Sequence, residues 1–168
     1  MTIPLEIIDL SKTYDTKEAV RDISFKVNEN EIIGILGPNG CGKTTTIGMI
    51  LGLLKPTKGK VLINGIEIEK QRVELLNELN FISPYIELPK KLTVKQNLEV
   101  YGRLYDVKEL GIKIDYLCEK LRLNEFINKI TGELSSGQKN RVSLAKSIIN
   151  DPSAVSYTHL RAHETVKN

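Results

Sequence analysis

Short apolar runs typical of β-strands occupy the first part of the chain, with polar or glycine-rich stretches between them. We expect strands at Leu5–Leu10 and Ile23–Val27, where β-favouring residues partly alternate with polar ones. The polar residues Ser11–Glu18 between these runs are typical of a turn. The nearly continuous apolar run Glu31–Leu36 predicts a buried strand.

A glycine-rich loop follows this run directly, and the pattern then changes to that of a helix. We expect the helix at Lys43–Leu51, with Lys55-Pro56-Thr57 ending it. Further along, the sequence predicts a hairpin with arms at Lys60–Ile63 and Ile66–Ile68, because Asn64-Gly65 between them is a strong turn signal.

The second half of the chain has helical periodicity. We expect a helix at Thr93–Tyr105, with Thr93 as its N-cap. One face of this helix carries Val94, Leu98, Tyr101 and Tyr105. Two more helices are expected at Leu110–Leu123 and Gly137–Ile149, the latter with Val142, Ala145 and Ile149 on one side and Asp151-Pro152 at its end. Strands, a glycine-rich loop and then helices predict an α/β domain with a helical insertion.

Composition narrows the class of protein without identifying it. The chain has 168 residues, of which 40% are hydrophobic and 27% charged, as in a soluble globular domain. Its net charge of +3 is too small to indicate a nucleic-acid partner. Two cysteines, Cys41 and Cys118, form no disulfide framework and favour a reducing compartment. We find neither a signal peptide nor an apolar run long enough to span a membrane, so we expect a cytosolic protein.

The glycine-rich loop carries the strongest chemical signal. Residues 37–44 match the phosphate-loop pattern G-x-x-x-x-G-K-[ST], between a predicted strand and a predicted helix. Lys43 can bridge the β- and γ-phosphates of a nucleotide, and the Thr44 hydroxyl can ligate Mg²⁺. Thr45 can add a contact to the α-phosphate. The predicted nucleotide-binding residues are Gly37, Pro38, Asn39, Gly40, Cys41, Gly42, Lys43, Thr44 and Thr45.

Two other interpretations of this loop carry less weight. The loop could be a glycine-rich turn with a chance lysine, but its strand and helix context argues against this. Cys41 could be a catalytic thiol, but no histidine and asparagine accompany it, so we interpret it as a small loop residue.

A second motif identifies the family. The sequence Leu-Ser-Ser-Gly-Gln, followed by Asp151-Pro152, resembles the signature Leu-Ser-Gly-Gly-Gln of the ATP-binding cassette (ABC) ATPases, with Ser136 at its third position. Taken alone, this segment could be an ordinary loop and helix cap. Because the segment follows a phosphate loop in the same chain, its interpretation as the ABC signature is favoured. The signature residues are Leu134, Ser135, Ser136, Gly137 and Gln138.

The resemblance covers Pro4 to about Ser153 and implies a fold and two cofactors. It implies the ABC-type nucleotide-binding domain of the P-loop NTPases: an α/β fold with a mixed sheet, antiparallel N-terminal strands and a helical subdomain at about 84–136, within a domain of residues 1–153 that is incomplete at its C-terminus. ATP and Mg²⁺ are the implied cofactors. Tyr14 occupies the place of the aromatic residue that stacks on adenine in this family.

The resemblance also implies partners. Two copies would form a head-to-tail homodimer in the full-length form, in which the γ-phosphate at one phosphate loop meets Ser135 and the Gly137 amide of the other copy. Residues Leu92–Tyr105 resemble the corresponding part of type-2 exporters. We therefore expect an ATPase that couples ATP hydrolysis to transport, mainly export, through an integral membrane permease. It would lie on the cytoplasmic face of the cell membrane and bind no nucleic acid.

The sequence departs from the family in two places. Pro84 stands where the family places a glutamine that touches Mg²⁺ and senses the permease; Tyr85 or a neighbouring carbonyl could substitute. After Ala154-Val155 the expected strand breaks, and no Asp-Glu pair (the Walker B acids) or later switch histidine follows in the family pattern. We therefore expect no catalytic residues in this chain, an exposed sheet edge, and ATP binding without normal hydrolysis.

Residues 154–168 do not resemble the family. The string beginning at Ser156 is similar to the ends of unrelated sequences from draft assemblies, and translated adapter sequence or a frameshift is an economical account of it. His159, His163 and Glu164 have spacing that suits a metal site, but no further ligands accompany them.

Two alternative functions stay open. A soluble ABC-type ATPase of translation or DNA repair is one, although such proteins usually carry two cassettes or a coiled-coil insertion. A GTPase is the other, because Asn128-Lys-Ile-Thr131 begins like a guanine-binding motif. The final aspartate of that motif is missing, and the signature would have no role there.

Overall fold

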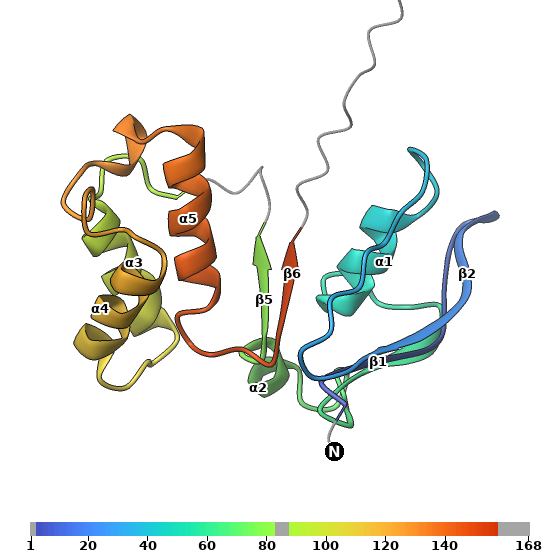
Figure 1. Cartoon of the computed structure of the whole chain (residues 1–168). Coiled ribbons are helices and arrows are strands. Elements are labelled where there is room, and N and C mark those ends of the chain that lie inside the picture. The colour runs from blue at the N-terminus through green and yellow to red at the C-terminus, as the bar shows by residue number, and fades with distance from the viewer. Residues whose placement is uncertain (1–2, 83–87, 158–168) are drawn as a thin grey trace, which may run out of the picture. The chain divides into compact units, whose positions relative to one another are not determined.

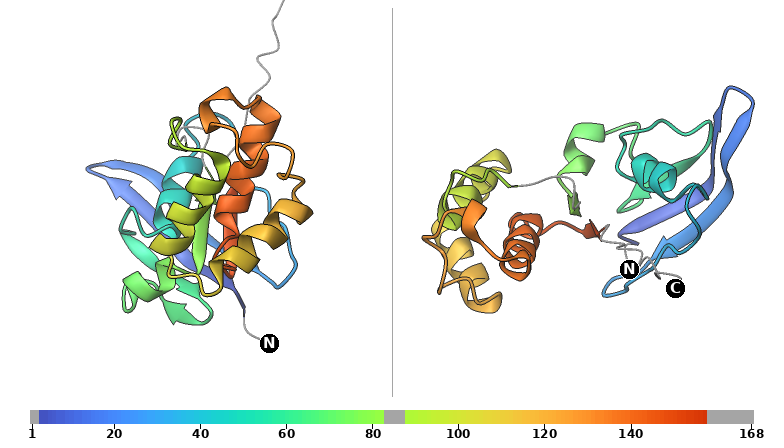
Figure 2. Two further views of the ribbon diagram at one scale, coloured as in Figure 1. Left: turned by 90° about the vertical axis from the view of Figure 1, so that its left-hand side faces the viewer. Right: turned by 90° about the horizontal axis from the view of Figure 1, so that it is seen from above.

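The computed structural model describes residues 3–82 and 88–157, and these form two compact units. The first unit comprises residues up to 80 together with 152–154, and the second comprises the described residues of 81–151 and 155–157. Figures 1 and 2 show the strand-rich first unit and the helical second unit. None of the helices in these described ranges has the length and apolar character that a membrane span requires.

The first unit is built on a four-stranded antiparallel sheet in the order β2-β1-β3-β4. Its strands are β1 (Leu5–Tyr14), β2 (Lys17–Val27), β3 (Lys58–Ile63) and β4 (Ile66–Glu67). The two predicted N-terminal strands and the predicted hairpin are therefore confirmed. The prediction of a turn over Ser11–Glu18 was too wide, because cross-strand pairing continues to Tyr14 and Lys17.

The core of this unit lies between the sheet and two helices, α1 (Lys43–Ile50) and α2 (Arg72–Leu76). Figure 1 shows α1 beside the β1–β2 hairpin. The prediction of a helix beginning at Lys43 is confirmed. The buried side chains of the core are Leu5, Ile7, Leu10, Val20, Met49, Ile50, Val61, Ile63, Ile68, Leu75 and Leu79.

The predicted buried strand over Glu31–Leu36 is wrong. These residues form no strand, and Ile32 is 98% and Leu36 82% exposed. A continuous apolar run becomes a strand only where neighbouring strands pair with it and other layers cover both of its faces. Both edges of β1 are taken by β2 and β3, and within residues 3–82 and 88–157 no strand pairs with this segment.

The second unit packs three helices, α3 (Val94–Leu104), α4 (Leu110–Lys120) and α5 (Ser136–Ser147). Helix α3 contacts both α4 and α5. All three predicted helices are confirmed, and the predicted apolar positions of α3 and α5 face the common core. The most deeply buried of these side chains are Val94, Leu98, Leu117, Leu123, Phe126, Val142, Ala145 and Ile149.

A two-stranded sheet pairs β5 (Leu79–Ile82) with β6 (Ala154–Tyr157). The predicted break after Val155 was placed too early, because β6 continues to Tyr157. The Ala154 N–H donates to the Glu78 carbonyl at 3.1 Å, which anchors the start of β6. The predicted boundaries of the domain and of the tail stay predictions.

The exposure of residues 31–36 can be tested by paired truncations. Ile32→Ala should change the free energy of unfolding by less than about 0.5 kcal/mol, because its side chain is already in water. Ile7→Ala should cost about 2–4 kcal/mol, because Ile7 is 1% exposed in the core of the same unit. Urea denaturation measures both. A cost above about 2 kcal/mol for Ile32→Ala would contradict the exposed segment.

Candidate nucleotide-binding site

The predicted phosphate loop ends at Gly42, the N-cap of α1, in a left-handed conformation with φ of 93°. A Cβ atom at this position would lie 2.4 Å from the Ala19 carbonyl oxygen of β2 and 3.0 Å from Val20. Residue 42 therefore has to be glycine for two reasons, its backbone conformation and this close approach. The contact also places the start of α1 against β2.

Lys43 folds back over the loop that precedes it. Its ammonium group donates hydrogen bonds to the carbonyl oxygens of Gly37 at 2.6 Å and Pro38 at 2.7 Å. The Cys41 Sγ lies 3.8 Å from the same nitrogen. The structure thus brings Gly37, Pro38 and Cys41 of the predicted residues together around the Lys43 ammonium, at a helix N-terminus whose dipole also favours anions.

The threonines that follow differ in their surroundings. Thr44 is exposed in the first turn of α1 and Thr45 is half-buried. Thr46 is buried, and its hydroxyl donates to the Gly42 carbonyl at 3.0 Å. Sequence reasoning missed Thr46 and Ala19 as supports of the loop. No local signal identifies Ala19, because its role depends on the position of β2.

The two cysteines also differ. Cys41 is exposed in the loop, whereas Cys118 is buried in the helical unit. Burial raises the pKa of the Cys118 thiol, with the Asp115 carboxylate adding to the rise. Cys118 therefore stays protonated and packs as an apolar residue.

Tyr14 lies at the end of β1 with 44% of its side chain exposed. The Lys12 ammonium lies 5.1 Å from the ring centroid and donates to the Lys55 carbonyl at 2.8 Å. The ring is thus accessible enough to stack on a flat base. Its role as the adenine-stacking residue stays a prediction.

The signature residues surround the start of α5. Ser135 is the N-cap, and its hydroxyl accepts from the Gln138 N–H at 3.3 Å while the Gln138 side chain accepts from the Ser135 N–H at 2.9 Å. Leu134 is buried and anchors the segment in the core. A Cβ at Gly137 would meet no heavy atom within 4 Å. The segment is therefore an ordinary capping box, and Ser136 and Gly137 in the first turn of its helix are exposed.

Several predicted positions lie outside the described residues, namely Pro84, Tyr85, His159, His163 and Glu164. In the part of the chain that the structure describes, no three His, Cys, Asp or Glu residues gather into a metal site.

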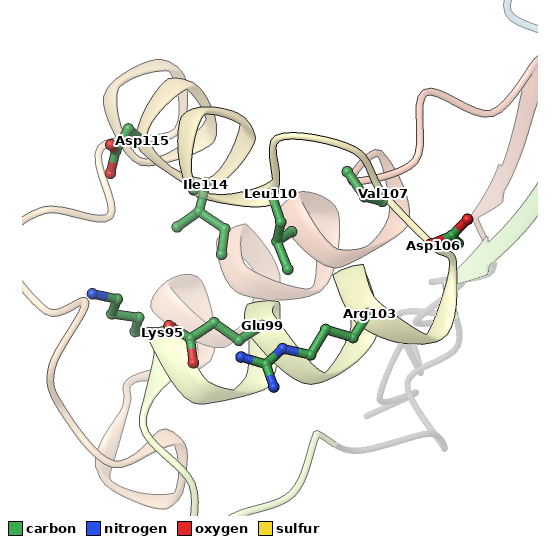
Figure 3. A pocket seen from close by; sticks show the side chains of 9 residues that line it. Lys95, Glu99, Arg103, Asp106, Val107, Leu110, Ile114 and Asp115 are labelled. Carbon is green, nitrogen blue, oxygen red and sulfur yellow. The ribbon is translucent and has the colours of Figure 1, made fainter.

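Figure 3 shows a separate pocket of about 640 Å³ between α3 and α4. Leu110, Ile114 and Asp115 on α4 line one side of it, and Lys95, Glu99 and Arg103 on α3 line the other. Both signs of charge line this pocket, so it lacks the uniformly positive character of a phosphate site.

The chain is similar in sequence to known proteins. The sequence model of the family described as "ABC transporter" matches residues 20–155. The Nod factor export ATP-binding protein I of Rhizobium etli is 36% identical over 150 residues, which are 88% of this chain and 48% of that protein. The ABC transporter ATP-binding protein NatA of Bacillus subtilis is 32% identical over 158 residues, which are 90% of this chain and 64% of that protein.

Solved structures show the same fold. CbiO1 from Clostridium perfringens, described as part of the ABC transporter complex cbiONQ, has a TM-score of 0.82 at 26% identity and covers 94% of this chain and 65% of its own. A structure described as the ATP binding subunit of an ABC transporter has a TM-score of 0.81 at 26% identity, over 93% of this chain and 65% of its own. The chain thus spans between about half and two thirds of the length of these relatives.

The close approach at Gly42 predicts a difference between two glycines of the loop. Gly40→Ala should cost about 1 kcal/mol, because φ is 83° there but nothing lies within 4 Å of a new Cβ. Gly42→Ala should cost at least about 2 kcal/mol more, because the methyl group also collides with the Ala19 carbonyl. Urea denaturation compares the two variants. Equal costs would contradict the steric role of Ala19.

Proposed function

Since this chain belongs to the ABC transporter ATP-binding family, we propose that it binds MgATP at residues 37–45 and presents residues 134–138 to the ATP of a second copy. The observation that carries the proposal is the position of the Lys43 ammonium, which the Gly37 and Pro38 carbonyls hold over the loop. Phosphate oxygens of a nucleotide would compete with these carbonyls for the same cation, and the phosphate is favoured because it carries a full negative charge whereas the carbonyls are neutral.

The first turn of α1 supplies the other contacts. No side chain caps this helix, so its first amides are available to phosphate oxygens. The exposed Thr44 hydroxyl is suited to hold Mg²⁺, a hard cation that takes oxygen ligands and offsets the charge of the phosphates. Tyr14 would stack on the adenine ring.

The signature would act on the ATP of the partner copy in a head-to-tail homodimer. The Ser135 hydroxyl accepts one bond from Gln138, which leaves its own proton to donate to a phosphate oxygen. Gly137 is exposed in the first turn of α5, and no heavy atom lies within 4 Å of where its Cβ would be, so a terminal phosphate can approach this turn.

The wider role follows from the relatives. We infer that the whole protein works with an integral membrane permease, mainly in export, on the cytoplasmic face of the membrane, because the similar proteins include export ATP-binding proteins and a member of a transporter complex.

Residues 154–168 contain no Asp-Glu pair, so the chain as printed should bind ATP with little turnover.

Loss of the lysine tests the nucleotide site. Lys43→Ala should weaken MgATP binding by about 10- to 100-fold, because it removes a charge-assisted contact to phosphate. Lys60→Ala, an exposed lysine on β3, should leave the affinity unchanged. Competition against a fluorescent nucleotide measures both variants. A preference for GTP over ATP, or equal binding by Lys43→Ala, would contradict the proposal.

A charge at the signature tests the dimer. Gly137→Glu should abolish MgATP-driven association, because the new carboxylate repels the partner's γ-phosphate, while ATP binding to the phosphate loop persists. The open space at residue 137 accommodates the side chain, and Gly137→Ala should associate normally. Light scattering coupled to size exclusion measures association. Equal association of the Glu variant would show that the signature does not face the nucleotide.

A further inference from the structure

Two segments of the helical unit are joined by a dense set of hydrogen bonds. The first segment runs from Pro89 to Asn97, through the start of α3, and the second runs from Ile127 to Leu134, just before the signature. Four backbone bonds connect them: Val94 N–H to Lys129 at 3.1 Å, Lys95 N–H to Ile127 at 2.9 Å, Thr131 N–H to Leu92 at 2.9 Å and Gly132 N–H to Lys90 at 3.0 Å. These bonds hold the two segments together.

Asn97 lies at the centre of this junction and is 1% exposed. Its amide nitrogen lies 2.8 Å from the Thr131 Oγ1, 3.2 Å from the Pro89 carbonyl oxygen and 3.1 Å from the Thr93 carbonyl oxygen. The Thr131 hydroxyl in turn donates to the Leu92 carbonyl at 3.0 Å. One buried amide and one buried hydroxyl thus tie both segments together.

Core packing does not account for this asparagine. Its Oδ1 atom is buried and has no hydrogen-bond partner among the described residues. A buried acceptor without a partner destabilises the folded state, and an apolar side chain of similar shape would avoid that penalty. The amide nitrogen, by contrast, donates to Pro89 and Thr131, so the same side chain fixes the two segments relative to each other.

The segment that Asn97 holds continues directly into the signature residues. Thr131 begins a short 3₁₀ turn, Thr131–Glu133, and the buried Leu134 follows it. Ser135 then caps α5. Only four positions separate the hydroxyl held by Asn97 from the serine that faces the partner's phosphate, and no flexible linker intervenes.

We propose that Asn97 and Thr131 are positioning residues, which set the place of Ser135 and Gly137 by tying the signature segment to the Pro89–Thr93 loop. The inference rests on the proposed function for what the signature does. A displacement of the Pro89–Thr93 loop would then be passed to the start of α5 without a change in the core of the helical unit.

Amide hydrogen exchange of the full chain, followed residue by residue by NMR, tests this proposal. Thr131→Val keeps the shape and removes the hydroxyl; the Gly132, Ser135 and Gln138 amides should exchange about tenfold faster. Thr131→Ser, which keeps the hydroxyl, should restore slow exchange. The Leu121 amide, which bonds to Leu117 at the end of α4, should not change.

Asn97→Leu separates positioning from stability. It removes the amide and its unpartnered oxygen, but the Pro89 and Thr131 acceptors also lose their donor. The unit should therefore stay folded with a modest loss of stability, while the Ser135 and Gln138 amides exchange faster than those of α4. Ser147→Ala, which removes a buried hydroxyl that donates to the Leu144 carbonyl within α5, is the matched control and should leave Ser135 unchanged.

Unchanged exchange at Ser135 in both Thr131→Val and Asn97→Leu would overturn the proposal, as would an equal acceleration throughout α3, α4 and α5. A functional measurement separates this failure from that of the proposed function. Thr131→Val should bind a fluorescent ATP analogue as tightly as the unmodified chain. An unmodified chain that does not bind MgATP contradicts the proposed function, and the exchange pattern still decides the role of Asn97.

Discussion

Strand β1 hydrogen-bonds along both of its edges, and the first unit depends on this double pairing. Pairing with β2 fixes the Ala19 carbonyl, and that carbonyl lies where only a glycine can begin α1. The sheet therefore positions the phosphate loop through the contact between Gly42 and the Ala19 carbonyl, although the loop is not a strand of that sheet. Because the sheet sets the start of α1, it also sets where Lys43 can fold back over the loop.

Elements whose signals are local could be predicted from the sequence. Helices α3 and α5 have a Thr or Ser cap with a Gln three residues later, and both capping boxes form. The Asn64-Gly65 turn likewise specifies its hairpin, since both residues adopt positive φ. Residues 31–36 show the limit of this reasoning. Their β-favouring composition is local, but a strand requires partners, and composition does not reveal whether partners are present.

The candidate site likewise has a part that could be predicted from local sequence and a part that could not. The motif at residues 37–44 could be found because successive backbone groups of one short segment create the chemistry. The supports of the site could not be found, since Ala19 and Thr131 act through residues far along the chain or through a fold that must form first. In the sequence, Asn97 is one polar position on an amphipathic helix. Only the structure shows that it is buried and bonded to Pro89 and Thr131.

The N-termini of α1 and α5 differ in their capping, and the difference suits the ligands that we propose for them. Helix α1 has no side-chain cap, so all the amides of its first turn stay available to a chain of phosphates. Helix α5 has a capping box that uses the Gln138 amide and leaves those of Ser136 and Gly137. Such a terminus suits one terminal phosphate rather than a whole triphosphate. The capping box of α5 forms without a ligand, so the contact with phosphate that we propose would depend on where Thr131 holds the start of this helix.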